Sequence, residues 1–117
     1  MHYKPGLHIL SEFRTVNIGL LNSSSTFRCH LADLIGRFKL HKVGEVYHDF
    51  ENGGFTAVVC LTESHISIHT WPEYELATFD VFLSNYQQEN DEMARAIYES
   101  VILFFGGTEL QKNEIKR

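Results

Sequence analysis

Cysteine is scarce in this sequence, and its apolar runs are short. Only Cys29 and Cys60 are present, without the Cys-x-x-Cys spacing of a redox or metal motif, so we expect two reduced, packed thiols. No run of about 18 apolar residues is available to span a bilayer. The N-terminal MHYKPGLHIL lacks the apolar stretch of a signal peptide. We therefore expect a cytoplasmic protein that does not cross a membrane.

Positive charge is also in short supply. The 117 residues include 10 Lys and Arg against 15 Asp and Glu, and the formal net charge is -5. A nucleic-acid-binding surface needs a stripe of basic residues to neutralise phosphates, and this chain has none. A neutral or cationic small molecule is the more suitable partner. The length corresponds to one domain, small enough for a subunit interface to help complete its core.

Hydrophobic periodicity predicts a mixed α and β domain. Apolar and polar residues alternate, as in strands, over residues 6–14, 43–50, 55–61, 65–71 and 75–83. Helical spacing is found after the Ser/Asn-rich start of residues 22–40 and again from Asn90 or Asp91 to Phe104. The order β-α-β-β-β-β-α predicts an α+β two-layer sandwich, with two helices on one face of a largely antiparallel sheet. We expect the charged tail, residues 109–117, to be a frayed end.

The same periodicity predicts a sheet with two unlike faces. In residues 65–71, Ile66 and Ile68 point toward the core, and the opposite face carries His65, Ser67, His69 and Trp71. This second face is too polar for a core and unusually aromatic for plain surface. It indicates a site or a dimer interface, although a solvated face produces part of the same pattern.

The segment TESHISIHTWPE, residues 62–73, holds a serine between an acid and two histidines. In an extended strand His65 and His69 lie about 13 Å apart, too far to share one metal ion. Ser64 and His69 lie about 16 Å apart by the same rule, and no G-x-S-x-G elbow is present, which argues against a serine hydrolase. If His69 acts at Ser64, it must come from a second copy of the chain or from a fold-back. We expect no metal site.

The peptide bond between Glu63 and Ser64 is itself a candidate for chemistry. A serine at a turn before a strand can attack its own preceding carbonyl, which replaces the amide with an ester if the backbone is strained and donors stabilise the oxyanion. Elimination and loss of ammonia then leave a pyruvoyl ketone at a new N-terminus.

Four motifs resemble one known family. ESHISIHTWPE at residues 63–73, ATFDVF at 77–82, GLHILSEF at 6–13 and YHDF at 47–50 are similar to segments of the short prokaryotic S-adenosylmethionine decarboxylase proenzymes, which are pyruvoyl-dependent enzymes of polyamine synthesis. The resemblance implies self-cleavage between Glu63 and Ser64 into a β chain, residues 1–63, and an α chain, residues 64–117. It also implies that Ser64 becomes a pyruvoyl group that forms a Schiff base with the substrate, without pyridoxal phosphate or a metal.

The resemblance further implies roles for individual residues in self-cleavage. Glu63 supplies the carbonyl of the cleaved bond. His69 matches the family histidine that takes a proton in the elimination step, and Thr56 stands where the family usually has a serine that helps the ester to form. The family completes its active site across a dimer, which agrees with the separation of Ser64 and His69 expected along a strand. We therefore expect a homodimer of processed protomers.

For the substrate, S-adenosylmethionine, the resemblance implies that Phe50 stacks on the adenine and that Glu73 accepts hydrogen bonds from the ribose hydroxyls. Glu12 matches an acid that lines the pocket, and Trp71 is a further aromatic candidate. Aromatic faces and carboxylates suit a permanent sulfonium cation. Apart from the resemblance, the aromatics could be ordinary packing residues and the acids ordinary surface residues.

One position departs from the family pattern. Where the family usually reads Thr-Cys-Gly after DVF, with the cysteine as the general acid of catalysis, this chain has Leu83, Ser84 and Asn85. A hydroxyl is a far weaker acid than a thiol, whose usual pKa is about 8.5, so Ser84 alone is a poor proton donor. Water held by Ser84 or the thiol of Cys60 could donate instead, or the substrate could differ.

Three functions remain open on the sequence. The motifs favour an S-adenosylmethionine decarboxylase that supplies decarboxylated S-adenosylmethionine for spermidine synthesis. A second function is the pyruvoyl-dependent decarboxylation of another amino acid, such as ornithine or arginine. The third is that of an unprocessed, non-catalytic dimeric module that binds a partner.

Overall fold

The computed structural model describes residues 2–117, which form six strands, three α-helices and one 3-10 helix. In chain order these are β1 (Leu7–Arg14), α1 (Ile18–Leu21), α2 (Ser24–Arg37), β2 (Lys42–Asp49), β3 (Phe55–Leu61), β4 (Ser64–Trp71), η1 (Pro72–Tyr74), β5 (Leu76–Leu83), α3 (Asp91–Phe105) and β6 (Thr108–Lys116). The five predicted strands match β1 to β5, with no end displaced by more than one residue. The two predicted helices correspond to α2 and α3.

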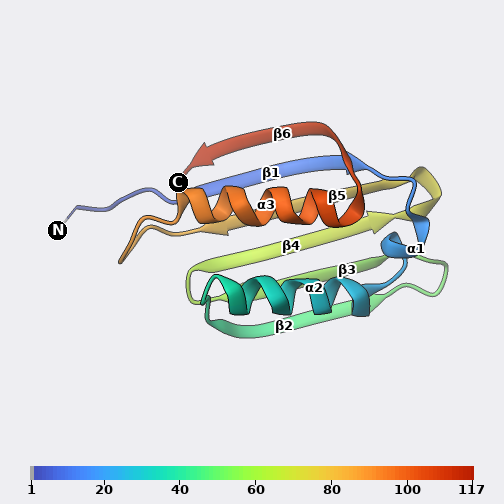
Figure 1. Cartoon of the computed structure of the whole chain (residues 1–117), viewed down its shortest axis with the longest axis horizontal. Coiled ribbons are helices and arrows are strands. Elements are labelled where there is room, and N and C mark those ends of the chain that lie inside the picture. Colours follow the sequence, from blue (N-terminus) through green and yellow to red (C-terminus); the bar gives the residue numbers. More distant parts are fainter. Residues whose placement is uncertain (1) are drawn as a thin grey trace.

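All six strands belong to one antiparallel sheet, in the order β2-β3-β4-β5-β1-β6. Figure 1 shows α2 and α3 lying along the same face of this sheet. Helix α3 packs on β1 and β5, and α2 packs on β2 and β3. No helix among residues 2–117 covers the other face, which we call the open face. The predicted α+β two-layer sandwich is confirmed.

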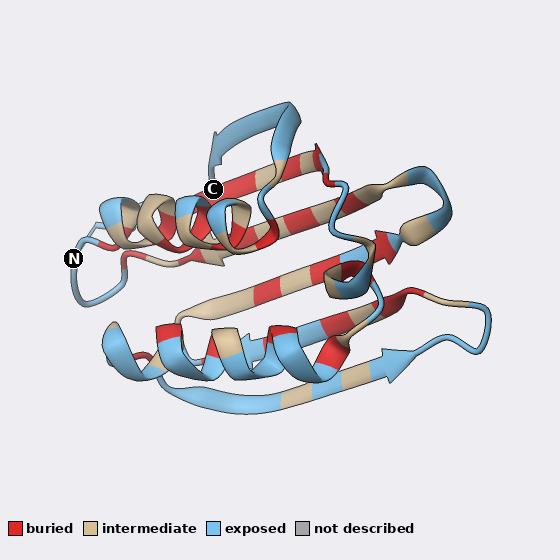
Figure 2. Cartoon of the chain, turned by 45° about the vertical axis from the view of Figure 1, so that its right-hand side comes forward, coloured by how far each residue is buried: buried red, intermediate tan, exposed pale blue. Residues whose placement is uncertain are grey.

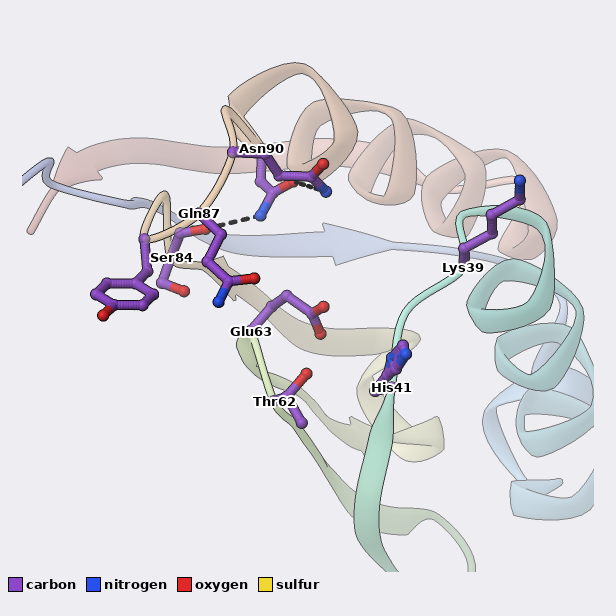
Figure 3. A pocket seen from close by; sticks show the side chains of 9 residues that line it. Lys39, His41, Thr62, Glu63, Ser84, Gln87 and Asn90 are labelled. Carbon is purple, nitrogen blue, oxygen red and sulfur yellow. Dashed lines mark hydrogen bonds between the residues drawn. The ribbon is translucent and has the colours of Figure 1, made fainter.

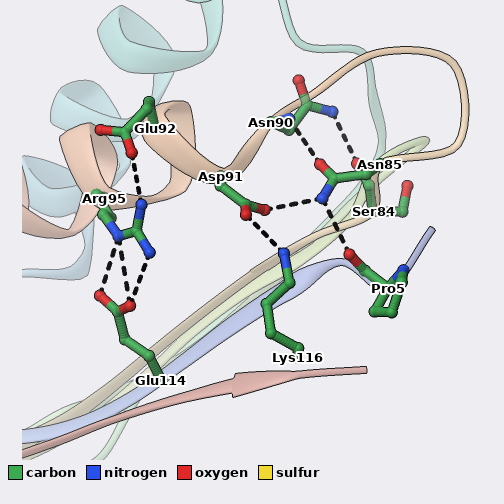
Figure 4. A network of polar contacts seen from close by, with 9 residues as sticks. All are labelled: Pro5, Ser84, Asn85, Asn90, Asp91, Glu92, Arg95, Glu114 and Lys116. Atoms are coloured by element: carbon green, nitrogen blue, oxygen red, sulfur yellow. Dashed lines mark hydrogen bonds and ion pairs between the residues drawn. The ribbon is translucent and has the colours of Figure 1, made fainter.

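The C-terminal tail is a strand rather than the frayed end predicted from the sequence. Strand β6 pairs with β1 along its length, and every residue of β6 is exposed. Residues 108–116 show no hydrophobic alternation, so the ladder of backbone hydrogen bonds could not be anticipated. Two ion pairs also tie β6 to α3, from Arg95 to Glu114 at 2.9 Å and from Lys116 to Asp91 at 2.5 Å (Figure 4).

The core lies between the helices and the sheet, as the buried stripes in Figure 2 show. Its largest fully buried side chains are aromatic: Phe13, Phe27, Phe55, Phe79 and Phe105. Ser23 caps the N-terminus of α2, and its hydroxyl accepts the backbone N–H of Thr26. Gly106, with φ of 62°, caps the C-terminus of α3 in the left-handed conformation that favours glycine. These caps define where the two helices begin and end.

The sheet interleaves the two halves of the chain. Residues before Ser64 form β1, β2 and β3, and residues from Ser64 onward form β4, β5 and β6. Because the spatial order is β2-β3-β4-β5-β1-β6, strand β1 lies between two strands of the second half. The two halves are therefore joined by three ladders, β3 with β4, β5 with β1, and β1 with β6.

His30 makes the stability of the fold sensitive to acid. Its ring stacks on Phe104 with centroids 4.3 Å apart. Burial lowers the pKa of His30 below its usual 6.5, with smaller effects from Asp33, which raises it, and from Arg37, which lowers it. The folded state thus binds the proton less tightly than the unfolded chain. The stability that the neutral His30 contributes is fully present above about pH 6.5. It is lost as the pH falls from there through the lowered pKa of His30.

We expect His30→Phe to remove part of this acid sensitivity, because phenylalanine keeps the stack on Phe104 but does not titrate. The measurement is the thermal unfolding midpoint between pH 7.5 and 5. The drop across this range should be smaller in the variant than in the wild type. The exposed His2 serves as a control, and His2→Phe should reproduce the wild-type drop. Equal drops in all three proteins would contradict the assignment to His30.

Candidate active site

The bond between Glu63 and Ser64 lies in a tight turn. Strand β3 ends at Leu61, β4 begins at Ser64, and these two residues pair across the hairpin, so that only Thr62 and Glu63 form the turn. The backbone of Ser64 has φ of 145°, a value that L-residues rarely adopt. Strained backbone of this kind persists only when the surrounding structure holds it in place. The strain falls at the bond for which the sequence predicted self-cleavage.

The carbonyl of this bond already accepts a hydrogen bond from the residue that follows β5. The backbone N–H of Ser84 donates to the carbonyl oxygen of Glu63 at 2.7 Å. If Ser64 attacks this carbonyl, negative charge develops on that same oxygen, and a fixed N–H donor stabilises it. The family pattern pointed to the Ser84 side chain, and the role of its backbone amide was not predicted. No residue type signals such a donor, because every residue except proline carries one.

A network of amides holds Ser84 in place (Figure 4). The side chain of Asn90 donates to the carbonyl of Ser84 at 2.8 Å, and the backbone N–H of Asn90 donates to Asn85 Oδ1 at 2.6 Å. The amide of Asn85 donates in turn to Asp91 Oδ1 at 2.8 Å and to the carbonyl of Pro5 at 3.0 Å. Asn85 and Asn90 are buried, so these bonds are shielded from water. The donor at Glu63 is thus fixed by its surroundings.

A second group of predicted residues lies toward the other end of β4. Thr56 on β3 and His69 on β4 are cross-strand partners, and Thr56 Oγ1 lies 2.5 Å from His69 Nδ1. A cavity of about 370 Å³ beside this pair is lined by five of the residues singled out in the sequence: Phe50, Thr56, His69, Trp71 and Glu73. Aromatic rings, a carboxylate and a hydroxyl–imidazole pair therefore meet in one place.

The two groups do not meet within one protomer. Ser64 is the first residue of β4 and His69 is the sixth, which separates them by about 16 Å in an extended strand. Glu12 lies apart from both, in a cavity of about 290 Å³ between β1, β5 and β6 that also contains Asp80. The predicted site residues are thus divided among three places on the sheet.

A histidine cluster on the open face was not anticipated. His8 on β1 and His65 on β4 both pack against Phe82 on β5, and the two imidazole centroids are 5.6 Å apart. Since His65 follows Ser64 directly, the cluster lies beside the strained turn. The alternation of residues 6–14 places His8 on the polar side of its strand. The sequence does not show that β1 and β4 both pair with β5, which brings His8 near His65.

His8 is almost enclosed by its neighbours. Arg117 Nη1 lies 3.4 Å from His8 Nδ1. His8 is only 7% exposed, yet its Nε2 has no hydrogen-bond partner among residues 2–117, and Asp80 Oδ2 is 3.8 Å away. Burial lowers the pKa of His8, with Asp80 acting in the opposite direction. His8 is thus a buried imidazole whose lowered pKa favours its neutral form.

Residues 2–117 lack two other kinds of feature. No cluster of three or more His, Cys, Asp or Glu side chains has an arrangement suited to a metal ion. No helix in this part of the chain has the length and apolar character needed to cross a membrane.

Comparison with known proteins identifies the family. The family model described as S-adenosylmethionine decarboxylase matches residues 7–117. The chain belongs to this family. Three relatives named S-adenosylmethionine decarboxylase proenzyme align over 77 residues, 66% of the chain. The identity is 40% for Archaeoglobus fulgidus, 42% for a Hydrogenobaculum species and 43% for Aquifex aeolicus. The aligned stretch spans 69%, 58% and 57% of these decarboxylase proenzymes, respectively.

A solved structure of the S-adenosylmethionine decarboxylase family shares the whole fold. The crystal structure of the adenosylmethionine decarboxylase from Aquifex aeolicus matches with a TM-score of 0.79 and 29% sequence identity. The match covers 99% of this chain and 91% of that one. The resemblance stated from the sequence motifs is confirmed, and it extends through β6 to the end of the chain.

Proposed function

We propose that this chain is a self-processing, pyruvoyl-dependent S-adenosylmethionine decarboxylase. The observation that carries the proposal is the geometry at Ser64. A strained serine follows a carbonyl that is already bound to the Ser84 amide, in a chain whose relatives are named as proenzymes of this decarboxylase. Decarboxylated S-adenosylmethionine, the donor for spermidine synthesis, is then the product.

Self-processing would proceed in two stages at this turn. The Ser64 hydroxyl oxygen attacks the Glu63 carbonyl carbon, the Ser84 N–H stabilises the oxyanion, and the C–N bond breaks to leave an ester and a free amine on residue 64. A base then removes the α-proton of residue 64, and the ester C–O bond breaks to release the Glu63 carboxylate. The remaining dehydroalanine takes up water and loses ammonia. We assign the role of this base to His69. We assign to Thr56 a role in helping the ester to form.

The mature site supplies an electrophile. The pyruvoyl group provides a ketone that binds the amine of the substrate and accepts the electrons released as carbon dioxide leaves. Phe50 and Trp71 offer aromatic faces for the adenine, and Glu73 offers an acceptor for the ribose hydroxyls in the same cavity. Glu12 and Asp80 place negative charge on the open face, which suits a sulfonium cation.

The separation of Ser64 from His69 supports a homodimer. In one protomer these residues occupy opposite parts of β4, so His69 cannot act at its own Ser64 without refolding of the strand. If two open faces pack together, the cavity around His69 of one protomer can face the Ser64 turn of the other. The site is then complete only in the dimer, and His69 works across the interface.

Other substrates are less well supported. Ser84 stands where the family usually has cysteine, which leaves the proton donor open. The hypothesis of an ornithine or arginine decarboxylase rests on the departure from the family pattern at Leu83, Ser84 and Asn85. The aromatic and acidic residues around His69 fit a nucleoside instead, and the relatives are named for S-adenosylmethionine. A non-catalytic binding module would have no use for the strained backbone of Ser64.

Intact mass of the purified protein tests the proposal. Under denaturing conditions the 13.5 kDa chain should resolve into fragments 1–63 and 64–117, the second beginning with a pyruvoyl group. Incubation with S-adenosylmethionine and cyanoborohydride should add a trapped adduct to fragment 64–117 alone. Competing ornithine or arginine should not lower the yield of this adduct. A single uncut chain would favour the binding module. A cut chain trapped by ornithine or arginine instead would favour the other decarboxylases.

A further inference from the structure

A third cavity lies against the turn, at the end of β4 opposite to His69. It measures about 510 Å³, and its lining includes Lys39, His41, Glu63 and Ser84 together with the loop that follows β5. Figure 3 shows the carboxylate of Glu63 pointing into this space, between the loop and the segment that carries His41. We call it the turn cavity. It contains the residue whose carbonyl is attacked in the proposed self-cleavage.

The turn cavity has an excess of groups that bind anions. Lys39 and His41 make no ion pair within residues 2–117, although they share the cavity with Glu63. Glu63 is the one carboxylate in the lining, and its Oε1 is buried without a hydrogen-bond partner in the described chain. A buried acceptor left unpaired is unfavourable. The Lys39 ammonium, the His41 ring and the Glu63 acceptor therefore lack ion-pair or hydrogen-bond partners, respectively, before cleavage.

His41 is held close to the turn by the backbone. The N–H of Thr62 donates to the carbonyl of His41 at 2.9 Å, so the segment 39–41 lies directly beside the residue before Glu63. Lys39 lies at the rim, and its flexible side chain can swing into the cavity (Figure 3). Residue 63 therefore lines the same cavity as both groups, and after cleavage it would be a free chain end.

We propose that Lys39 and His41 form a binding site for the carboxylate that self-cleavage creates at Glu63. The inference rests on the proposed function. When the ester breaks, the electron pair of its C–O bond leaves with the Glu63 carboxylate, and the α-proton of residue 64 goes to the base. Residue 63 then carries two carboxylates. Positive charge in the turn cavity stabilises the leaving group as it forms, and it draws the new chain end away from the Ser84 N–H.

This role predicts which stage of processing depends on the two residues. The first stage moves an acyl group from nitrogen to oxygen and releases no carboxylate, so it should not depend on Lys39 or His41. The elimination stage releases the carboxylate and should slow when they are removed. The ester intermediate should therefore accumulate in the variants. A purely structural defect would instead slow the first stage or unfold the protein.

The test uses Lys39→Gly and His41→Gln, singly and together. Lys39 has φ of 57°, where glycine is the better residue, so Lys39→Gly removes the ammonium without harming the backbone. Aliquots taken during processing are treated with hydroxylamine, which cleaves the ester to give a hydroxamate on Glu63 and a free Ser64 amine. The double variant should form fragment 64–117 with a pyruvoyl end about tenfold more slowly, with the hydroxylamine-sensitive form accumulating.

Matched controls separate the outcomes. Lys39→Arg should restore the wild-type rate, and Lys42→Gln should leave it unchanged, because Lys42 pairs with Glu45 on the same segment rather than lining the cavity. Wild-type rates with no trapped ester in the double variant would overturn this inference while leaving self-processing intact. An uncut wild-type chain would overturn the proposed function and, with it, the need for a carboxylate site.

Discussion

Ser64→Ala should leave the chain uncut, however long it is incubated. The change removes only the hydroxyl oxygen that attacks Glu63, and that hydroxyl makes no hydrogen bond within residues 2–117. The variant should therefore fold as well as the wild type while retaining an intact bond after residue 63. The measurement is intact mass, which should show one species of 13.5 kDa.

Two companion variants sharpen this result. Ser67→Ala removes another hydroxyl from β4, three residues farther along, and should be cleaved at the wild-type rate. Ser64→Cys keeps a nucleophile at the turn and should be cleaved slowly. Cleavage of Ser64→Ala into the same two fragments would mean that the hydroxyl of residue 64 is not the nucleophile.

Ser84→Pro should slow cleavage by about 10²- to 10³-fold, the usual effect of removing one oxyanion donor. Proline lacks the N–H that binds the Glu63 carbonyl at 2.7 Å. Leu83 is the last residue of β5 and is extended, which is the conformation that a following proline favours. The measurement is the rate at which fragment 64–117 appears, together with the thermal midpoint of the uncut protein.

Substitutions that retain the amide provide the comparison. Ser84→Ala and Ser84→Cys change the side chain only, so both should cleave at close to the wild-type rate. If Ser84→Pro is folded and cleaves as fast as these two, the amide of residue 84 does not stabilise the oxyanion. The alanine and cysteine variants also show, by their decarboxylation rates, whether the side chain at position 84 donates the proton to the product.

The sequence predicted those parts of the fold that bury an apolar face. Strands β1, β3, β4 and β5 and helices α2 and α3 each bury apolar residues and were located from their hydrophobic period. Strand β2 has no buried residue, but apolar and polar residues alternate along it, and it was located from that alternation. Strand β6 buries nothing and is held by backbone pairing to β1, so its residues look like a charged tail. Helix α1 is four residues long, too short to show a helical period.

The candidate site was predictable where side chains carry the chemistry. Ser64 and His69 were identified by residue type and motif, and strand geometry alone indicated that they lie far apart in one protomer. The donor from Ser84, the strain at Ser64 and the contact of His8 with His65 were not predictable. They depend on backbone angles and on the register between strands distant in the sequence, which a residue type does not record.

Cleavage at the turn would make folding a reaction between two chains instead of one, without changing the folded structure. Because β1 is inserted between β5 and β6, the two fragments stay together through three ladders. Their unfolding, however, releases two separate chains, and refolding becomes a bimolecular encounter. The stability of the mature protein is then governed by mass action and rises with its concentration, whereas the precursor folds alone. If the chain processes itself as proposed, it must fold before it is cut, and the separated fragments would refold poorly at low concentration.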